Sequence, residues 1–128
     1  MITLDNIRTI HESTINMDRV DNPDDFVEGE RYIATLENML DYNVSDNNTC
    51  YHNAAIALQT IAAEHPFFNG NKRTAIVTAI MLLRNEGLYM SINDMYNIQF
   101  IIDIATPQRE ITLEEIENWL IDSSTRIM

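Results

Sequence analysis

The chain has 128 residues, a single cysteine and a formal net charge of −12, which arises from 20 acidic and 8 basic side chains. This length suits one domain that buries a hydrophobic core without cross-links. Cys50 cannot form an internal disulfide, and the first residues show no charged and then apolar leader, so we expect a cytoplasmic protein. The acidity disfavours a broad nucleic-acid-binding surface, and the most apolar stretch, residues 75–83, is too short to span a membrane.

Hydrophobic spacing predicts a first helix from Leu4 to about Met17, because Leu4, Ile7 and Ile10 recur on one helical face. His11 lies beside this apolar face. Since no second histidine stands at metal-ligand spacing from it, we interpret His11 as a surface or half-buried histidine that belongs to no site.

A second helix is expected after a polar stretch that contains Pro23, with an acidic start near Asp25. Residues 41–49, Asp-Tyr-Asn-Val-Ser-Asp-Asn-Asn-Thr, are rich in turn-forming side chains and predict an irregular segment after this helix. The apolar residues that recur at helical spacing predict the buried stripe of the second helix: Phe26, Ile33, Leu36 and Leu40.

Two further helices are predicted on either side of a short loop. The third runs from about Cys50 to Ala63, and its alanines allow close approach to another helix. The fourth runs from about Asn71 to Glu86. Residues 75–83 are apolar on every side except at Thr78, so we expect the fourth helix to be a central rod surrounded by other helices.

The loop before the fourth helix belongs to a nine-residue segment, 65–73, with the sequence His-Pro-Phe-Phe-Asn-Gly-Asn-Lys-Arg. A helix N-terminus that follows a glycine attracts anions, and Arg73 can place two N–H groups on phosphate oxygens. His65 is the side chain suited to accept a proton from a hydroxyl at neutral pH. A base beside a phosphate site suits transfer of part of a nucleotide to a hydroxyl group. The alternative is an ordinarily capped helix and a histidine that is merely hydrogen-bonded.

The last third of the chain predicts two more helices. Residues 88–90 form a short apolar link, and a fifth helix follows from Ile92 to about Ala105, where Thr106-Pro107 stops it. Thr112-Leu113-Glu114-Glu115 is a capping box that begins a sixth helix, which ends near Ser124. The buried stripe expected of the fifth helix consists of Met95, Ile98, Ile101 and Ile102.

Residues 65–73 resemble the core motif of the Fic/Doc family, and their Lys-Arg ending resembles the Doc (death-on-curing) toxin subgroup, H-x-F-x-[D/N]-[A/G]-N-K-R. Weaker similarity covers Ile10-His11-Glu12, the end of the fourth helix and the late Glu-Ile-Thr at 110–112. The resemblance implies an all-α fold in which residues 1–128 form a single Fic/Doc domain. That domain is a compact six-helix bundle around a central buried helix.

The resemblance also implies a role for most residues of the motif. His65 matches the catalytic base, and Phe67 matches the residue that anchors the loop in the core. Asn69 stands where many Fic proteins have a carboxylate that holds Mg²⁺, so Mg²⁺ is expected with Asn69 as a weaker ligand. The residues that match the nucleotide and phosphate site are Gly70, Asn71, Lys72 and Arg73.

The function that this family implies is transfer of a phosphate-containing group from ATP or another nucleoside triphosphate to a hydroxyl of a target protein. Lys72 replaces the glycine of adenylyl-transferring Fic enzymes, which favours the Doc-like mode. In that mode the terminal phosphate is transferred to a threonine of the translation elongation factor that delivers aminoacyl-tRNA. Transfer of AMP or another nucleoside monophosphate is one alternative, and a catalytically silent nucleotide- or protein-binding module is another.

Two further expectations concern partners of the protein. Residues 41–49 occupy the place of the family's flap, a short β-hairpin that receives the target segment, although a solvated loop is an equal alternative. The inhibitory motif [S/T]-x-x-x-E-[G/N] of self-inhibited Fic proteins has no match, because His65 follows the Thr60–Glu64 segment and Ile111 follows Thr106–Glu110. We therefore expect a toxin that is restrained by a separate antitoxin protein.

Overall fold

The computed structural model describes residues 2–21, 29–90 and 95–126, with the backbone alone for residues 17–21, 95 and 96. Within these ranges the chain is mainly helical, which confirms the predicted all-α fold. The six α-helices are α1 (Leu4–Asp21), α2 (Ile33–Asn38), α3 (Cys50–Glu64), α4 (Asn71–Arg84), α5 (Met95–Ile104) and α6 (Leu113–Ser123). Two single-turn helices, Met39–Asn43 and Pro107–Arg109, and two short strands, β1 (Leu88–Met90) and β2 (Ser124–Arg126), complete the described structure.

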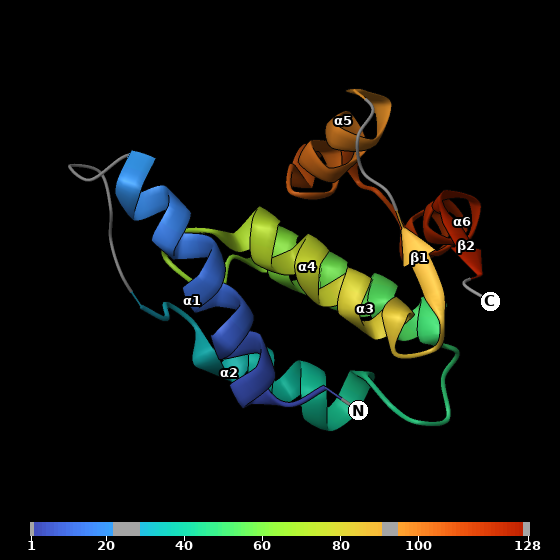
Figure 1. The fold of residues 1–128 in the computed structure, drawn as a ribbon, viewed down its shortest axis with the longest axis horizontal. Coiled ribbons are helices and arrows are strands. Elements are labelled where there is room, and N and C mark those ends of the chain that lie inside the picture. Colours follow the sequence, from blue (N-terminus) through green and yellow to red (C-terminus); the bar gives the residue numbers. More distant parts are fainter. Residues whose placement is uncertain (1, 22–28, 91–94, 127–128) are drawn as a thin grey trace.

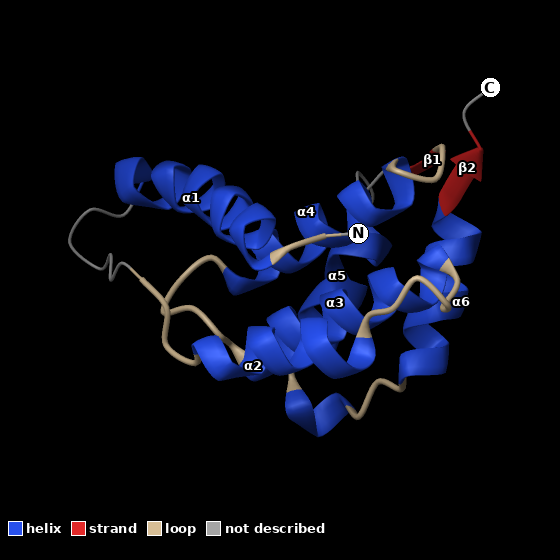
Figure 2. Cartoon of the chain, turned by 90° about the horizontal axis from the view of Figure 1, so that it is seen from below, coloured by secondary structure: helices blue, strands red, loops and turns tan. Residues whose placement is uncertain are grey.

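The antiparallel pair of α3 and α4 forms the middle of the fold (Figure 1). Helix α1 packs on α4 and helix α2 packs on α3 at one side of this pair, while α5 and α6 cover the other side (Figure 2). Small residues of the third helix permit this close packing, because Ala54, Ala55, Ala57 and Ala62 are completely buried. The core is therefore built on α3 as much as on α4.

Hydroxyl side chains begin three of the helices. The Thr112 hydroxyl accepts a hydrogen bond from the Glu115 N–H at 3.1 Å, as the capping box predicted, and Thr49 caps α3 in the same way. At the start of α1, Thr3 and Asn6 cap each other reciprocally, with the Thr3 N–H donating to the Asn6 amide oxygen at 3.0 Å. The Thr-x-x-Asn pattern at residues 3–6 is the sequence signature of this reciprocal cap.

Helix α4 is not enclosed on all sides, so the expectation of a fully surrounded rod is only partly right. Ala75, Ala79 and Leu83 are completely buried. A second line of apolar side chains instead faces an open groove against α1, which we name the α1–α4 groove. It has a volume of about 540 Å³, and its lining includes Ile10, Thr14, Arg73, Ile76, Val77 and Met81.

The N-terminal helices differ in length from the prediction. Helix α1 continues to Asp21, four residues beyond the expected end. The second helix begins only at Ile33, because residues 29–32 bond to the loop before α4 instead of to a helical turn. Leu36 is buried as expected, and Phe26 lies outside the described residues.

The predicted buried stripe of α5 is wrong at two positions. Ile98 and Ile102 are 43% and 42% exposed, whereas Ile101 and Ile104 are buried. The reason is that the helix is apolar on more than one face, so the sequence does not show which face meets the core. Phe100 and Trp119 of α6 pack together with ring centroids 5.0 Å apart, which fixes the face that α5 turns inward.

The link at residues 88–90 forms a strand that the sequence did not predict. Strand β1 pairs antiparallel with β2, and Tyr89 lies opposite Thr125 in the register. Three-residue strands carry too little alternation to be recognised, so this pairing depends on how α4 and α6 are placed. None of the described helices has the length and apolarity to cross a bilayer.

The two faces of α4 predict different responses to truncation. Leu83→Ala should lower the free energy of unfolding by roughly 2 to 5 kcal/mol, because it leaves a cavity in a completely buried position. Met81→Ala is the matched control on the same helix: its side chain is 42% exposed, and its loss should cost less than about 1 kcal/mol. Urea unfolding of both variants measures the difference, and equal losses would contradict the burial of this face.

Candidate active site

The nine-residue motif lies at one end of the α3–α4 pair. His65 ends α3 with a left-handed backbone conformation, φ 50° and ψ 61°, which non-glycine residues rarely adopt. This turn directs the chain away from α3 into the loop of residues 66–70. The His65 side chain is half-buried at the start of the loop. Contacts with surrounding residues must hold the backbone in such a conformation.

Phe67 and Asn71 connect the loop to the start of α4. The Phe67 side chain is 1% exposed, so it lies in the core. The Asn71 amide oxygen accepts a hydrogen bond from the Phe67 N–H at 3.0 Å, and the Asn71 amide nitrogen donates to the Phe67 carbonyl at 2.9 Å. Both ends of the Asn71 side chain thus bond to the backbone of Phe67, and they tie the loop to the first turn of α4.

His11 of α1 lies against this loop and is buried, so the expectation of a surface or half-buried histidine is wrong. Its ring stacks on Phe67 with centroids 3.7 Å apart and planes 9° apart. Its Nε2 atom is 2.9 Å from the Asn69 carbonyl oxygen, and the residue is only 5% exposed. The spacing from Ile7 to His11 is one helical repeat, and this signal could have placed His11 on the buried face.

Gly70 also lies close against α1. Its φ of +74° favours glycine, and a Cβ atom there would lie 3.2 Å from both the Thr14 hydroxyl and the Ile15 side chain. Thr14 also hydrogen-bonds the Thr74 hydroxyl at 3.1 Å, which ties α1 to the first turn of α4. A side chain at residue 70 would therefore strain the backbone and push α1 away.

Residues 29–32 run beside the loop as an extended segment. Glu30 and Phe67 form an antiparallel bridge. The N–H groups of Arg31 and Tyr32 both donate to the Pro66 carbonyl, at 2.7 and 2.9 Å, while the Gly29 carbonyl accepts from the Phe68 N–H at 3.2 Å. An ion pair between Arg8 and Glu30 holds the same segment to α1.

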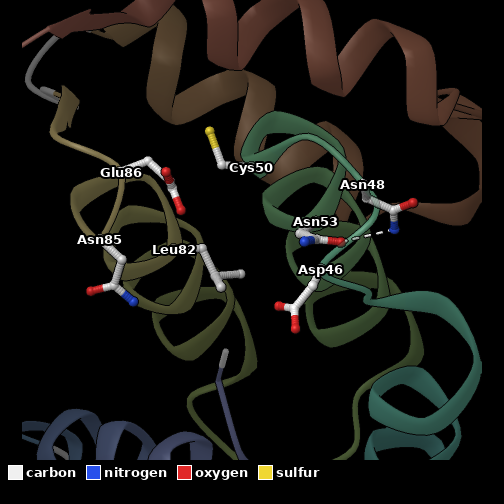
Figure 3. A pocket seen from close by; sticks show the side chains of 7 residues that line it. All are labelled: Asp46, Asn48, Cys50, Asn53, Leu82, Asn85 and Glu86. Atoms are coloured by element: carbon white, nitrogen blue, oxygen red, sulfur yellow. Dashed lines mark hydrogen bonds between the residues drawn. The ribbon is translucent and has the colours of Figure 1, made fainter.

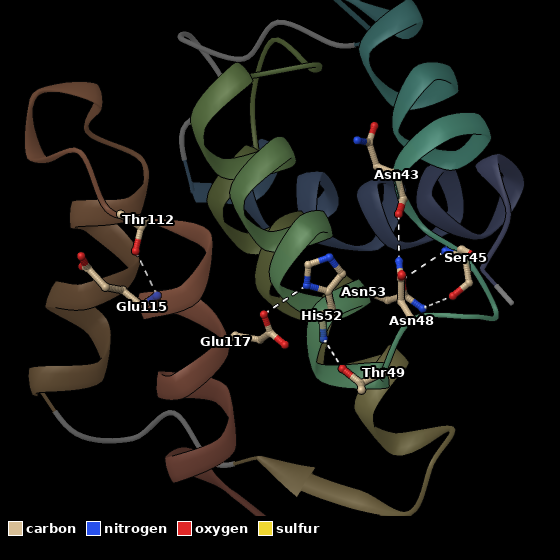
Figure 4. A network of polar contacts seen from close by, with 9 residues as sticks. All are labelled: Asn43, Ser45, Asn48, Thr49, His52, Asn53, Thr112, Glu115 and Glu117. Carbon is tan, nitrogen blue, oxygen red and sulfur yellow. Dashed lines mark hydrogen bonds and ion pairs between the residues drawn. The ribbon is translucent and has the colours of Figure 1, made fainter.

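The segment predicted as the flap lies elsewhere. Residues 41–43 belong to a helical turn, and the residues after them bond to the start of α3 (Figure 4). The Asn53 amide accepts from the Ser45 N–H at 3.1 Å and donates to the Ser45 carbonyl at 2.8 Å. Since α3 is 15 residues long, its start is roughly 22 Å from the motif. Residues 41–49 are thus the end of a helical turn and a loop at the opposite end of the fold, and the flap prediction is wrong.

The structure brings the predicted site residues together around one pocket, which we name the motif pocket. It is lined by residues 65 and 68–73 and has a volume of about 370 Å³. Lys72 and Arg73 are exposed at its edge. Gly70 provides no side chain to cap α4, so the first-turn N–H groups and the positive end of the helix dipole face this region. Phe67 lies behind the loop, outside the pocket lining.

The donor set of the motif pocket does not fit a metal site made by the protein alone. Mg²⁺ in proteins is bound through one or two carboxylates together with substrate phosphates. Among the described residues, those that line the pocket include no carboxylate, and the neutral amide of Asn69 shares the pocket with two cations. The described part of the chain holds no cluster of three potential metal ligands either.

Another pocket, at the far end of α3 and α4, has the wrong chemistry for a nucleotide (Figure 3). It has a volume of about 120 Å³, and the carboxylates of Asp46 and Glu86 line it together with Cys50. Burial, and then the nearby Glu86 charge, raise the pKa of the Cys50 thiol, which makes it a poor nucleophile at neutral pH. Phosphate would be repelled here.

Comparison with known proteins identifies the family of the chain. A search of curated proteins gives no match. The family model for the Fic/DOC family matches residues 2–83, a range that includes α1, the extended segment, the whole motif and nearly all of α4. Members of that family are generally transferases that act on proteins, and they generally use ATP as the donor. Because the match covers well over half of the chain, the chain belongs to the Fic/DOC family.

Proposed function

We propose that residues 1–128 act as a single Fic/Doc domain that transfers the terminal phosphate of ATP to a hydroxyl group of a target protein. One observation carries this proposal: the motif pocket combines His65 with the uncapped start of α4 and the cations Lys72 and Arg73. A triphosphate needs the positive site, and a hydroxyl nucleophile needs the base. Other nucleoside triphosphates present the same phosphates and could serve as donors.

The proposed step needs one base and one anion site. His65 accepts the proton of the target hydroxyl, and the freed oxygen forms a bond to the γ-phosphorus. The bond between that phosphorus and the β–γ bridging oxygen breaks, and ADP leaves. The first-turn N–H groups of α4 and Arg73 offset the negative charge of the phosphates during this exchange. The proton on His65 then passes to solvent.

Lys72 favours phosphate transfer over transfer of a nucleoside monophosphate. Its exposed cationic side chain lies at the edge of the motif pocket. The motif of the adenylyl-transferring Fic enzymes has glycine at this position. A long side chain there would crowd a second phosphate on that side, so the donor would bind with its terminal phosphate toward His65. Transfer of AMP remains the alternative reaction.

A catalytically silent binding module is the alternative from a different class. Its support is the absence of a carboxylate from the described residues that line the motif pocket. Such a protein would bind ATP without turnover. Mg²⁺ would then enter only with the nucleotide, and Asn69 would be the side chain of the pocket best suited to contact it.

We place target docking at the extended segment of residues 29–32 instead of residues 41–49. The Gly29 carbonyl and the Arg31 N–H both hydrogen-bond to the loop before α4. Successive residues of an extended chain direct their backbone groups to opposite edges, so the Glu30 N–H and carbonyl face the other edge. A target strand added at that edge would carry its hydroxyl beside His65. A threonine of the translation elongation factor that delivers aminoacyl-tRNA is the target we favour.

We also propose that the protein is the toxin of a toxin–antitoxin pair, since family members typically pair with antitoxins. The α1–α4 groove suits an amphipathic antitoxin segment: it is mostly apolar, and Arg73 lies at its margin. A carboxylate of the antitoxin would compete with phosphate for Arg73 through a charge-assisted hydrogen bond. The acidic surface opposes this only weakly, because salt screens its field beyond roughly 8 to 10 Å.

Label transfer from ATP tests the proposed reaction. With γ-labelled ATP and a cell extract, the protein should label one target, whereas α-labelled ATP should give no protein-bound label. Protein labelled by α-labelled ATP and not by γ-labelled ATP would establish transfer of AMP. No transfer from either labelled ATP would favour the catalytically silent binding module.

Two histidine variants provide the matched controls for this experiment. His65→Ala should lower label transfer by about 100-fold or more, because it removes the general base, and the unfolding temperature should stay within a few degrees. His52→Ala should transfer label normally, because the His52 ring bonds Glu117 at 3.1 Å at the far end of α3. Wild-type transfer by His65→Ala would remove His65 from the mechanism.

Co-expression with the chromosomal neighbour tests the antitoxin. Expression of the chain alone should arrest growth, and the neighbour should restore growth. Met81→Glu in the α1–α4 groove should weaken this rescue, whereas Ile121→Glu, at a similarly exposed position on α6, should not. If a demonstrably active enzyme is harmless on expression, the toxin role is refuted. If the neighbour rescues growth equally well with Met81→Glu, antitoxin binding in the α1–α4 groove is refuted.

A further inference from the structure

We infer that His11 of α1 is a positioning residue for the phosphate site, because it sets the direction of the peptide bond between Asn69 and Gly70. This inference rests on the proposed function, since it assigns a residue to the same site. His11 itself does not line the motif pocket, so it touches neither donor nor target. Its effect would pass through the loop backbone.

The hydrogen bond of His11 fixes one side of that peptide. A carbonyl oxygen can only accept, so the His11 Nε2 atom, 2.9 Å away, carries the proton and donates to Asn69. In a trans peptide the carbonyl and the following N–H point in opposite directions. With the Asn69 carbonyl held toward α1, the Gly70 N–H must point away from α1.

The motif pocket lies on that opposite side. Among the described residues, those lining the motif pocket all belong to the loop, with His65 at its start, and to α4. His11 instead lines a separate space between α1 and the extended segment, together with Arg8, Glu12 and Phe67. The Gly70 N–H is therefore directed toward the place where phosphate oxygens would bind, in line with the first-turn N–H groups of α4.

Glycine makes this control necessary. Gly70 has wide conformational freedom, so a peptide beside it can rotate unless its surroundings hold it. The His11 residue is only 5% exposed, and its ring stacks on Phe67. The Asn71 side chain in turn hydrogen-bonds the backbone of Phe67, so the His11 ring packs against a fixed partner. A packed ring that donates to the Asn69 carbonyl keeps the adjacent N–H in the orientation that an anion needs.

Two substitutions separate the hydrogen bond from the packing. His11→Phe keeps a ring that can stack on Phe67 and removes the donor. His11→Gln removes the ring and keeps an amide N–H that reaches about as far as Nε2. The probe is inorganic tripolyphosphate, whose dissociation constant is measured by calorimetry. We expect about tenfold weaker binding for His11→Phe, the effect of one misdirected hydrogen-bond donor, and a change of less than about threefold for His11→Gln.

Arg73→Ala is the control that separates this inference from the proposed function, and it should weaken tripolyphosphate binding by at least about tenfold. If Arg73→Ala has no effect, the motif pocket is not an anion site and the proposed function fails. If Arg73→Ala weakens binding but His11→Phe does not, only the role of His11 is overturned. Equal losses in both His11 variants would assign the effect to packing and also overturn it.

A measurement on the unmodified protein decides the case in which a His11 variant does not fold. In a ¹⁵N–¹H titration with tripolyphosphate, the Gly70 amide should be among the signals that shift most. An unshifted Gly70 amide, with shifts confined to the amides of residues 71–73, would overturn the inference.

Discussion

The close contact of α1 with the loop before α4 is the constraint on which the rest of the site depends. At Gly70 a Cβ atom would lie only 3.2 Å from Thr14 and Ile15, so a side chain there would be tightly crowded as well as strained in its backbone. The same helix supplies the ring that stacks on Phe67 and, through Arg8, the ion pair that holds the extended segment. Helix α1 thus supports both the loop of the motif pocket and the segment proposed for target docking. A small displacement of α1 would change both.

The charge distribution complements this geometry. The chain carries a net charge of −12, and its one lysine, Lys72, is adjacent to Arg73 at the start of α4. These two cations and the positive end of a helix dipole therefore act together in a small region of an otherwise acidic protein. The far pocket, lined by Asp46 and Glu86, shows the opposite polarity. In the proposed function, charge and backbone N–H groups alike would direct the anionic donor to one end of the α3–α4 pair.

The sequence predicted the parts of the fold that depend on local signals. The capped start of α6 and the bounds of α3 and α4 follow from side chains within one helical turn, and the structure confirms them closely. The contacts that shape the site are long-range: His11 is 58 residues from Asn69, and residues 29–32 are paired with residues 66–68. No local pattern encodes such pairings. Local signals therefore favour the most turn-rich segment, at the other end of α3, as the place of a flap or a solvated loop, and they indicate a surface or half-buried position for His11.

A crystal structure with a non-hydrolysable ATP analogue tests the central claim most directly. The account predicts the terminal phosphate in the motif pocket, within hydrogen-bond distance of the first-turn N–H groups of α4 and of Arg73. The outer phosphate oxygens should face the His65 side, where the target hydroxyl would approach. A triphosphate bound in the α1–α4 groove, or bound so that its α-phosphate is the one nearest His65, would contradict it.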